Sequence, residues 1–259
     1  MPFRRLPDSV ATSRAALETA RQKYLATAAP QRLLTEAQFA DHLDPATPAA
    51  GAPGSTLYRL IKEAGEATAA LAAQTPVTRE TEQARASLGL HISHFIQNLN
   101  NAILRGDLPS ETRTLFQLPL EDERVPLLVT DADLLLWSDH IAAGENARAL
   151  AGGEPLTWPS AARIAQLRDQ LSQLIDTQST AKDLTDAEQT DVQLLMPAVT
   201  AAIKDLWDTI EFNLRHEPDA PSLRRRAREW GVHYATRPGE APDPDGPQEP
   251  DGPQEPAVS

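Results

Sequence analysis

The fold of this chain is decided by residues 56–73, which read TLYRLIKEAGEATAALAA. Six of these residues recur at every third or fourth position, so they fall on one stripe of a helix: Leu57, Leu60, Ile61, Ala64, Thr68 and Leu71. A helix with such a stripe buries one face and exposes the other to water. The sequence therefore predicts an amphipathic α-helix over 56–73.

A second stripe starts a few residues later. Its members have helical spacing between Thr78 and Gly106, a glycine that is well placed to end the helix, and they are Ala84, Leu88, Ile92, Phe95, Ile96, Leu99 and Ile103. We predict that this helix folds back on the first one as a helical hairpin. Shorter helices are predicted over 9–28 and 35–43, and the second of them starts with a capping box of Thr35 and Gln38.

The second half of the chain has the same plan. Ser160 is expected to cap a helix whose apolar residues are Ile164, Leu167, Leu171 and Ile175. Thr185 and Glu188 form a second expected capping box, which would start a long helix with the apolar residues Leu195, Val199, Ile203, Leu206 and Ile210. Pro197 lies inside that helix and predicts a kink or a break near Leu194.

The two halves are related by a shift of 107 residues, which brings Leu57 onto Ile164 and Leu99 onto Leu206. We predict an all-α fold of two duplicated helical hairpins that form one antiparallel four-helix bundle, with two small bundles as the alternative. The predicted parts are an N-terminal helix over 1–34, a first repeat over 35–118, a second repeat over 130–234, and a tail over 235–259.

Composition narrows the possible functions. The tail repeats PDGPQE in tandem and has too few apolar residues to offset its ordering entropy, so we expect it to be disordered. The net charge of −13 disfavours nucleic acid as a partner, because nonspecific binding to phosphates requires basic residues. The chain has no cysteine, and we see neither a signal peptide nor a membrane-spanning segment, so we expect a cytoplasmic protein.

A polar strip on the same predicted helix as the second apolar stripe is the most specific candidate site. His91 and His94 are one helical turn apart, and they are followed on roughly the same face by Asn98, Asn101 and Arg105. Two imidazoles at this spacing suit a zinc or iron site completed by carboxylates from a facing helix, for which the sequence offers Asp205, Asp208 and Glu211. The alternative, which we favour, is a polar strip that meets solvent, a short helix or another subunit.

A basic segment near the end of the predicted body is the second candidate. It comprises Arg224, Arg225, Arg226, Arg228 and Trp230, behind a possible cap at Ser222. Arginines around a short helix with an aromatic anchor could bind phosphate, RNA or an acidic partner. The alternative is that these arginines pair with carboxylates of the same polypeptide.

Two Asp-His pairs, Asp41-His42 and Asp139-His140, are weaker candidates for catalysis because neighbours in a helix point about 100° apart. We expect instead that Phe39 and Trp137 anchor these short helices. None of the familiar phosphate-binding, nucleophile or zinc-protease motifs occurs. The sequence favours a non-enzymatic structural or protein-interaction bundle without a cofactor, acting on a protein partner or by self-association. Metal or small-ligand binding, and phosphate or RNA binding, are the alternatives.

Overall fold

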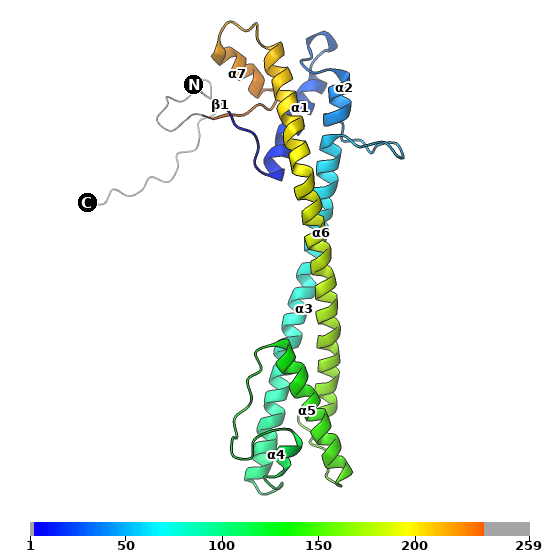
Figure 1. Ribbon diagram of the computed structural model, residues 1–259, viewed down its shortest axis with the longest axis vertical. Coiled ribbons are helices and arrows are strands. Elements are labelled where there is room, and N and C mark those ends of the chain that lie inside the picture. Colours follow the sequence, from blue (N-terminus) through cyan, green and yellow to red (C-terminus); the bar gives the residue numbers. More distant parts are fainter. Residues whose placement is uncertain (1–2, 236–259) are drawn as a thin grey trace, which may run out of the picture. The chain divides into compact units, whose positions relative to one another are not determined.

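The computed structural model describes residues 3–235, and this part of the protein is helical apart from a short two-stranded ribbon (Figure 1). Its elements in order are β1 (Phe3–Arg4), α1 (Val10–Ala26), η1 (Ala29–Gln31), α2 (Glu36–Gln38), η2 (Phe39–Leu43), α3 (Thr56–Leu104), α4 (Thr112–Leu115), α5 (Asp131–Leu150), α6 (Ala161–Asn213), α7 (Ala220–Arg228) and β2 (Tyr234–Ala235). The all-α prediction is confirmed. Apart from Ala235, the predicted tail lies outside the described residues.

The two predicted hairpins are wrong, because each is one continuous helix. The helix α3 has 49 residues and α6 has 53, and Figure 1 draws both without interruption. Pro76 lies inside α3 at the expected turn; its cost of about 3 kcal/mol is local, and the alanine-rich residues before it favour helix. Thr185 caps nothing, since its hydroxyl donates to the Ala181 carbonyl oxygen at 3.0 Å within α6. The break expected near Leu194 is also absent, because α6 continues through Pro197.

The protein divides into two compact units. Within the described residues, unit 1 comprises 3–68 and 187–235, and unit 2 comprises 69–186. Each unit therefore takes the first part of one long helix and the last part of the other. This division cuts across the repeats predicted from sequence, which assigned each long helical segment to a single repeat.

Unit 1 has its own core. Buried side chains from α1, α3, α6 and α7 meet in it, among them Leu17, Leu60, Leu206, Trp207 and Trp230. The Phe39 ring stacks on the Tyr24 ring at a centroid distance of 4.5 Å, so the short helix η2 is anchored by its aromatic residue as predicted. The β1–β2 ribbon pairs Arg4 with Tyr234 in antiparallel register.

Unit 2 has a separate core, built from α3, α5, α6 and the segment around α4. Its buried residues include Leu88, Phe95, Leu99, Phe116 and Ile164. Contacts join Thr78 to Gln178 and Asn98 to Trp158, so α3 and α6 run antiparallel within this unit. The single four-helix bundle that we expected is wrong because the long helices do not fold back. The two cores also differ from the alternative of one small bundle per repeat, because each core takes residues from both long helices.

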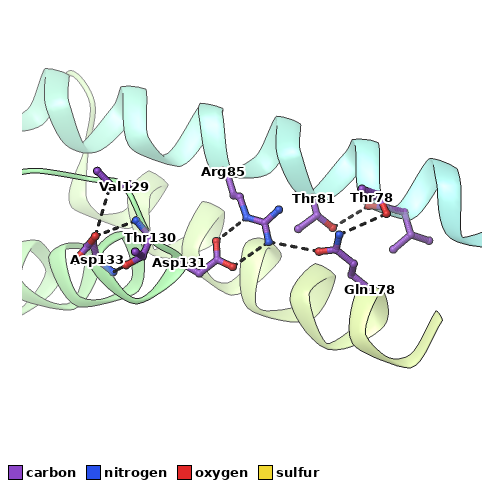
Figure 2. Close-up of polar contacts among 9 residues, drawn as sticks. Thr78, Thr81, Arg85, Val129, Thr130, Asp131, Asp133 and Gln178 are labelled. Atoms are coloured by element: carbon purple, nitrogen blue, oxygen red, sulfur yellow. Dashed lines mark hydrogen bonds and ion pairs between the residues drawn. The ribbon is translucent and has the colours of Figure 1, made fainter. Parts of the chain in front are cut away.

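A polar network ties three helices of unit 2 together (Figure 2). Arg85 of α3 donates from Nε to Asp131 Oδ1 at 2.6 Å and from Nη2 to Asp131 Oδ2 at 2.9 Å. The same Nη2 reaches Gln178 Oε1 of α6 at 3.4 Å. Asp131 is the first residue of α5, and the hydrogen bond from Arg85 lowers the pKa of its carboxyl below the usual value. This guanidinium therefore fastens the start of α5 to both long helices.

Candidate binding groove

An open groove of about 500 Å³ lies in unit 2, where α3 faces the loop between α5 and α6. Its walls comprise His91, His94, Gln97, Asn98, Asn101, Trp158 and Pro159. The structure thus gathers four members of the polar strip predicted from sequence and adds two residues of a loop. Arg105 is not among the lining residues, and its Nε donates to Asp107 Oδ2 at 2.9 Å.

The helical side of the groove follows from the periodicity of α3. Ile92, Phe95, Ile96 and Leu99 are almost fully buried in the core of unit 2. Residues between these positions must point away from the core, because successive side chains on a helix are about 100° apart. His94, Gln97, Asn98 and Asn101 occupy those positions and are exposed.

The other side of the groove is a loop that carries Trp158 and is held by hydrogen bonds. The Asn98 Nδ2 group donates to the Trp158 carbonyl oxygen. On either side of this contact, the Leu156 amide donates to Glu145 Oε1 at 2.7 Å, and the Arg163 amide donates to Ser160 Oγ at 3.2 Å. The second bond confirms the predicted Ser160 cap. Trp158 itself is 83% exposed, so the loop presents a large aromatic residue to solvent.

Sequence reasoning missed Trp158 as a site residue and treated it only as part of the segment before the cap. A signal was present, because a single tryptophan within the polar, proline-containing stretch 151–160 has no apolar stripe to join. Gln97 was missed as well. It lies between His94 and Asn98 of the polar strip, at a position outside the apolar stripe.

His91 is oriented by its own helix. The Ser87 carbonyl oxygen lies 2.7 Å from His91 Nδ1, and because a carbonyl only accepts, Nδ1 carries the proton. In the neutral imidazole the Nε2 atom is then left as an acceptor or a metal ligand. This arrangement suits binding through Nε2.

The predicted metal centre is not completed as expected. The carboxylates proposed to complete it, Asp205, Asp208 and Glu211, belong to unit 1, whereas His91 and His94 belong to unit 2. Among residues 3–235 one set of three potential ligands lies within 4.8 Å, and it consists of Glu63, Glu66 and Glu188. Its first two members already pair with Lys62, at 3.1 and 2.8 Å. A zinc or iron site at His91 and His94 therefore stays a prediction, without a third ligand from the described residues.

The chemistry of the groove is neutral and polar. No lysine, arginine, aspartate or glutamate is among its lining residues. Its three carboxamides each carry both N–H donors and an acceptor oxygen, although one donor of Asn98 is used by the Trp158 carbonyl. The two imidazoles add nitrogen atoms that can donate or accept. Such a surface suits a ligand that both donates and accepts hydrogen bonds and carries no net charge.

Behind the groove, a buried arginine fixes the loop that follows α4. Arg113 is 2% exposed; it donates to Asn100 Oδ1 and, from Nε, to the Pro119 carbonyl oxygen at 2.6 Å. Asn100 in turn donates to the Glu123 carbonyl oxygen at 2.7 Å. Arg113 therefore fastens the loop that follows α4 to α3.

The predicted basic surface on α7 is changed by the structure. Trp230 is 3% exposed and belongs to the core of unit 1, so it is wrong as a surface anchor for a partner. The cap of α7 is Asp219, which accepts from the Ser222 amide at 2.7 Å, and Ser222 is therefore not the cap. Arg226 pairs with Glu217, and the Arg228 guanidinium lies 5.5 Å from the centre of the Tyr234 ring. Arg224 and Arg225 also have interaction partners.

Neither Asp-His pair forms a catalytic dyad in the contacts of the described residues. His42 Nδ1 lies 3.0 Å from Thr56 Oγ1, and Asp139 pairs with Arg168 at 3.3 Å. The His140 ring meets the Trp137 ring edge-on at 5.1 Å. Trp137 packs against the core of unit 2, as its predicted anchoring role requires.

No family model, curated protein or solved structure matches this sequence. Within residues 3–235, none of the helices combines the length and the apolar character needed to cross a membrane.

Proposed function

We propose that this protein is a non-enzymatic interaction protein that holds a partner polypeptide in the groove of unit 2. The observation that carries the proposal is the position of Trp158 beside the groove, 83% exposed on a loop that is hydrogen-bonded to α3. Trp207 and Trp230 are at most 3% exposed, and Trp137 is half-buried. Tryptophan is enriched among the residues that dominate binding energy at protein interfaces, because it buries a large area at a small entropic cost.

The composition of the groove supports binding over catalysis. The titratable side chains among its lining residues are the imidazoles of His91 and His94. General acid–base catalysis commonly needs an imidazole oriented by a carboxylate and aimed at a reacting group. His91 is instead oriented by the carbonyl of Ser87 in its own helix. The carboxamides next to it are hydrogen-bonding groups that recognise ligands without taking part in proton transfer.

Site-specific crosslinking in the native host tests this function. A photoreactive amino acid in place of Gln97 should give a discrete protein adduct, because Gln97 lines the groove and is exposed. The adduct should disappear in a Trp158→Ala background. Leu127→Ala is a matched control, since Leu127 is 82% exposed and is not among the lining residues. Absence of any adduct, or an adduct equally strong in the Trp158→Ala background, would refute the proposed function.

Metal binding at the same face is the second candidate. It is favoured by the hydrogen bond from His91 Nδ1 to Ser87, which leaves Nε2 free to coordinate a cation. Calorimetric titration of the untagged protein with zinc should then give a stoichiometric transition that His94→Ala removes. A titration curve that is the same for wild type and His94→Ala would exclude this candidate.

A further inference from the structure

In unit 1, one face of α6 is covered by another segment of the chain. The face of α6 that carries Asp208 and Glu211 is occupied by the β1–β2 ribbon. Arg4 Nη1 lies 2.5 Å from Asp208 Oδ1 and 3.6 Å from Glu211 Oε2. The Tyr234 hydroxyl donates to Glu211 Oε1 at 2.5 Å. Extended backbone with a cationic side group thus lies on an acidic helical face.

The groove of unit 2 lies on the corresponding face of α3. Residues 94–101 and 201–208 share one order of exposed and buried positions along all eight residues. The shift between them is the 107 residues noted in the sequence, and it brings Asn98 onto Asp205 and Asn101 onto Asp208. The same shift brings Leu104, which is 67% exposed, onto Glu211. The two faces therefore have the same helical frame, and the acidic residues of one are neutral in the other.

We infer that the groove of unit 2 binds an extended, uncharged segment of a partner polypeptide that crosses α3 at Asn101, the position that corresponds to Asp208 under the ribbon in unit 1. This inference rests on the proposed function and specifies the partner. Its basis is the juxtaposition of an open, neutral groove with a matching face that extended backbone already covers.

The neutral residues determine which segment fits. A carboxamide can accept from a backbone N–H and donate to a backbone carbonyl oxygen, so Asn98, Asn101 and Gln97 can satisfy the unpaired polar groups of an extended segment. An arginine at the place that Arg4 takes in unit 1 would be partly desolvated without a carboxylate partner, which is unfavourable. Trp158 supplies a flat apolar surface for one uncharged residue of the segment.

Other ligand classes fit less well. A nucleotide or a phosphopeptide would bring negative charge to a groove whose lining residues include no lysine or arginine. A carbohydrate could stack on Trp158 and bond to the carboxamides, but nothing else among the described residues points to one, whereas the ribbon on α6 points to extended backbone. Carbohydrate binding is therefore an outcome that the experiment must separate.

The test uses a random phage-displayed peptide library selected on the full-length protein, followed by synthesis of the enriched peptides. We expect enriched peptides that are poor in arginine, lysine, aspartate and glutamate and that bind Trp158→Ala at least about tenfold more weakly than wild type. Bound peptides should give an extended rather than a helical signature in isotope-edited infrared spectra. Leu127→Ala should bind them as wild type does, and circular dichroism should show that each variant keeps its helical content.

A charge-swap variant makes the test sharper. Asn101→Asp combined with Leu104→Glu reproduces on α3 the two carboxylates that contact the ribbon on α6. Both positions are exposed and Asn98 still holds the Trp158 loop, so folding should be unaffected. The variant should lose the neutral peptides and gain affinity for a synthetic peptide of residues 1–8, which contains Arg4, and should lose that gain when the peptide carries Arg4→Gln.

The possible failures are distinguishable. Library selection without enrichment, enriched peptides that are charged or helical, or an unchanged preference in the charge-swap variant would overturn this inference. If the Gln97 adduct still forms and depends on Trp158, the proposed function survives and only the extended, uncharged segment is wrong. Binding to a glycan array that is lost in Trp158→Ala, together with failure of the peptide selection, would assign the groove to carbohydrate and overturn both proposals.

Discussion

The contact between Arg85 and Asp131 gives a prediction that joins stability to pH. Asp131→Asn keeps the shape of the residue but removes the charge that holds two arginine hydrogen bonds of 2.6 and 2.9 Å. Both members of the ion pair are 33% exposed, so the pair lies between a surface and a buried one. We expect the loss of the pair to cost about 1 kcal/mol of unfolding free energy. Loss of the negative charge at the start of α5 adds about 0.5 kcal/mol.

The sign of the pH dependence follows from the direction of the pKa shift. The hydrogen bond from Arg85 lowers the pKa of Asp131 in the folded protein, so its contribution is present above the unfolded value of about 3.9 and is lost as pH falls through the folded value. Urea unfolding at pH 7 should therefore show Asp131→Asn to be less stable than wild type by about 1.5 kcal/mol in total. The difference should shrink as the pH falls through the folded pKa of Asp131, because both proteins become neutral at this position.

Asp186→Asn is the matched control, because Asp186 pairs with Lys182 on the exposed surface of α6 and should give no measurable change. A destabilisation by Asp131→Asn that does not shrink as the pH is lowered would show that the carboxylate charge is not what fastens α5. A full-sized effect in Asp186→Asn would show that any lost surface charge suffices.

Four further substitutions test the packing. Arg113→Ala should lower the unfolding free energy by about 3 kcal/mol in urea unfolding, because a 2% exposed guanidinium that bonds Asn100 and two loop carbonyls is removed; a loss of under 1 kcal/mol would contradict its role. Gly144→Ala should destabilise the protein by about 2 kcal/mol, because a Cβ there would lie 2.8 Å from a backbone carbonyl oxygen. Gly65→Ala has open space around it and should stabilise α3 by about 0.5–1 kcal/mol. Equal thermal melting temperatures for the two variants would refute both predictions. Pro76→Ala should raise the melting temperature, because it restores a hydrogen bond inside a continuous helix, and a lower melting temperature would favour the turn that the sequence suggested.

The sequence could predict which residues face a core but not which core they share. Leu99 and Leu206 are 0% and 1% exposed, as their stripes required. Helical periodicity is the same whether a stripe belongs to one helix or to two, so the spacing could not decide between a hairpin and a continuous helix. The expected turn before Thr78 and the expected capping box at Thr185 both lie inside continuous helices. A long helix that packs against a partner tolerates the hydrogen bond lost at Pro76 and a stretch without an apolar stripe.

The candidate site was predictable only on its helical side. His91, His94, Asn98 and Asn101 share one face because of their spacing along α3, and this much is local. The other wall depends on the hydrogen bond from Asn98 to Trp158, which are 60 residues apart in the sequence. Contacts of this kind are set by how α5 and α6 return to α3, and no local pattern encodes them. Trp230 illustrates the converse, since an aromatic residue beside four arginines gave no sign in the sequence that it closes a core.

Charge distinguishes the two helical faces compared above. At the shift of 107 residues, an aspartate of α6 is replaced by an asparagine of α3 at two positions, and these two residue types have nearly the same volume. A carboxylate only accepts hydrogen bonds and attracts Arg4, whereas a carboxamide both donates and accepts and carries no charge. The same helical spacing can therefore bind the ribbon on the acidic face of α6 and disfavour it on the neutral face of α3. Specific binding requires that the wrong segment binds poorly as well as that the right one binds well. On the neutral face the wrong segment would leave its arginine without a carboxylate partner.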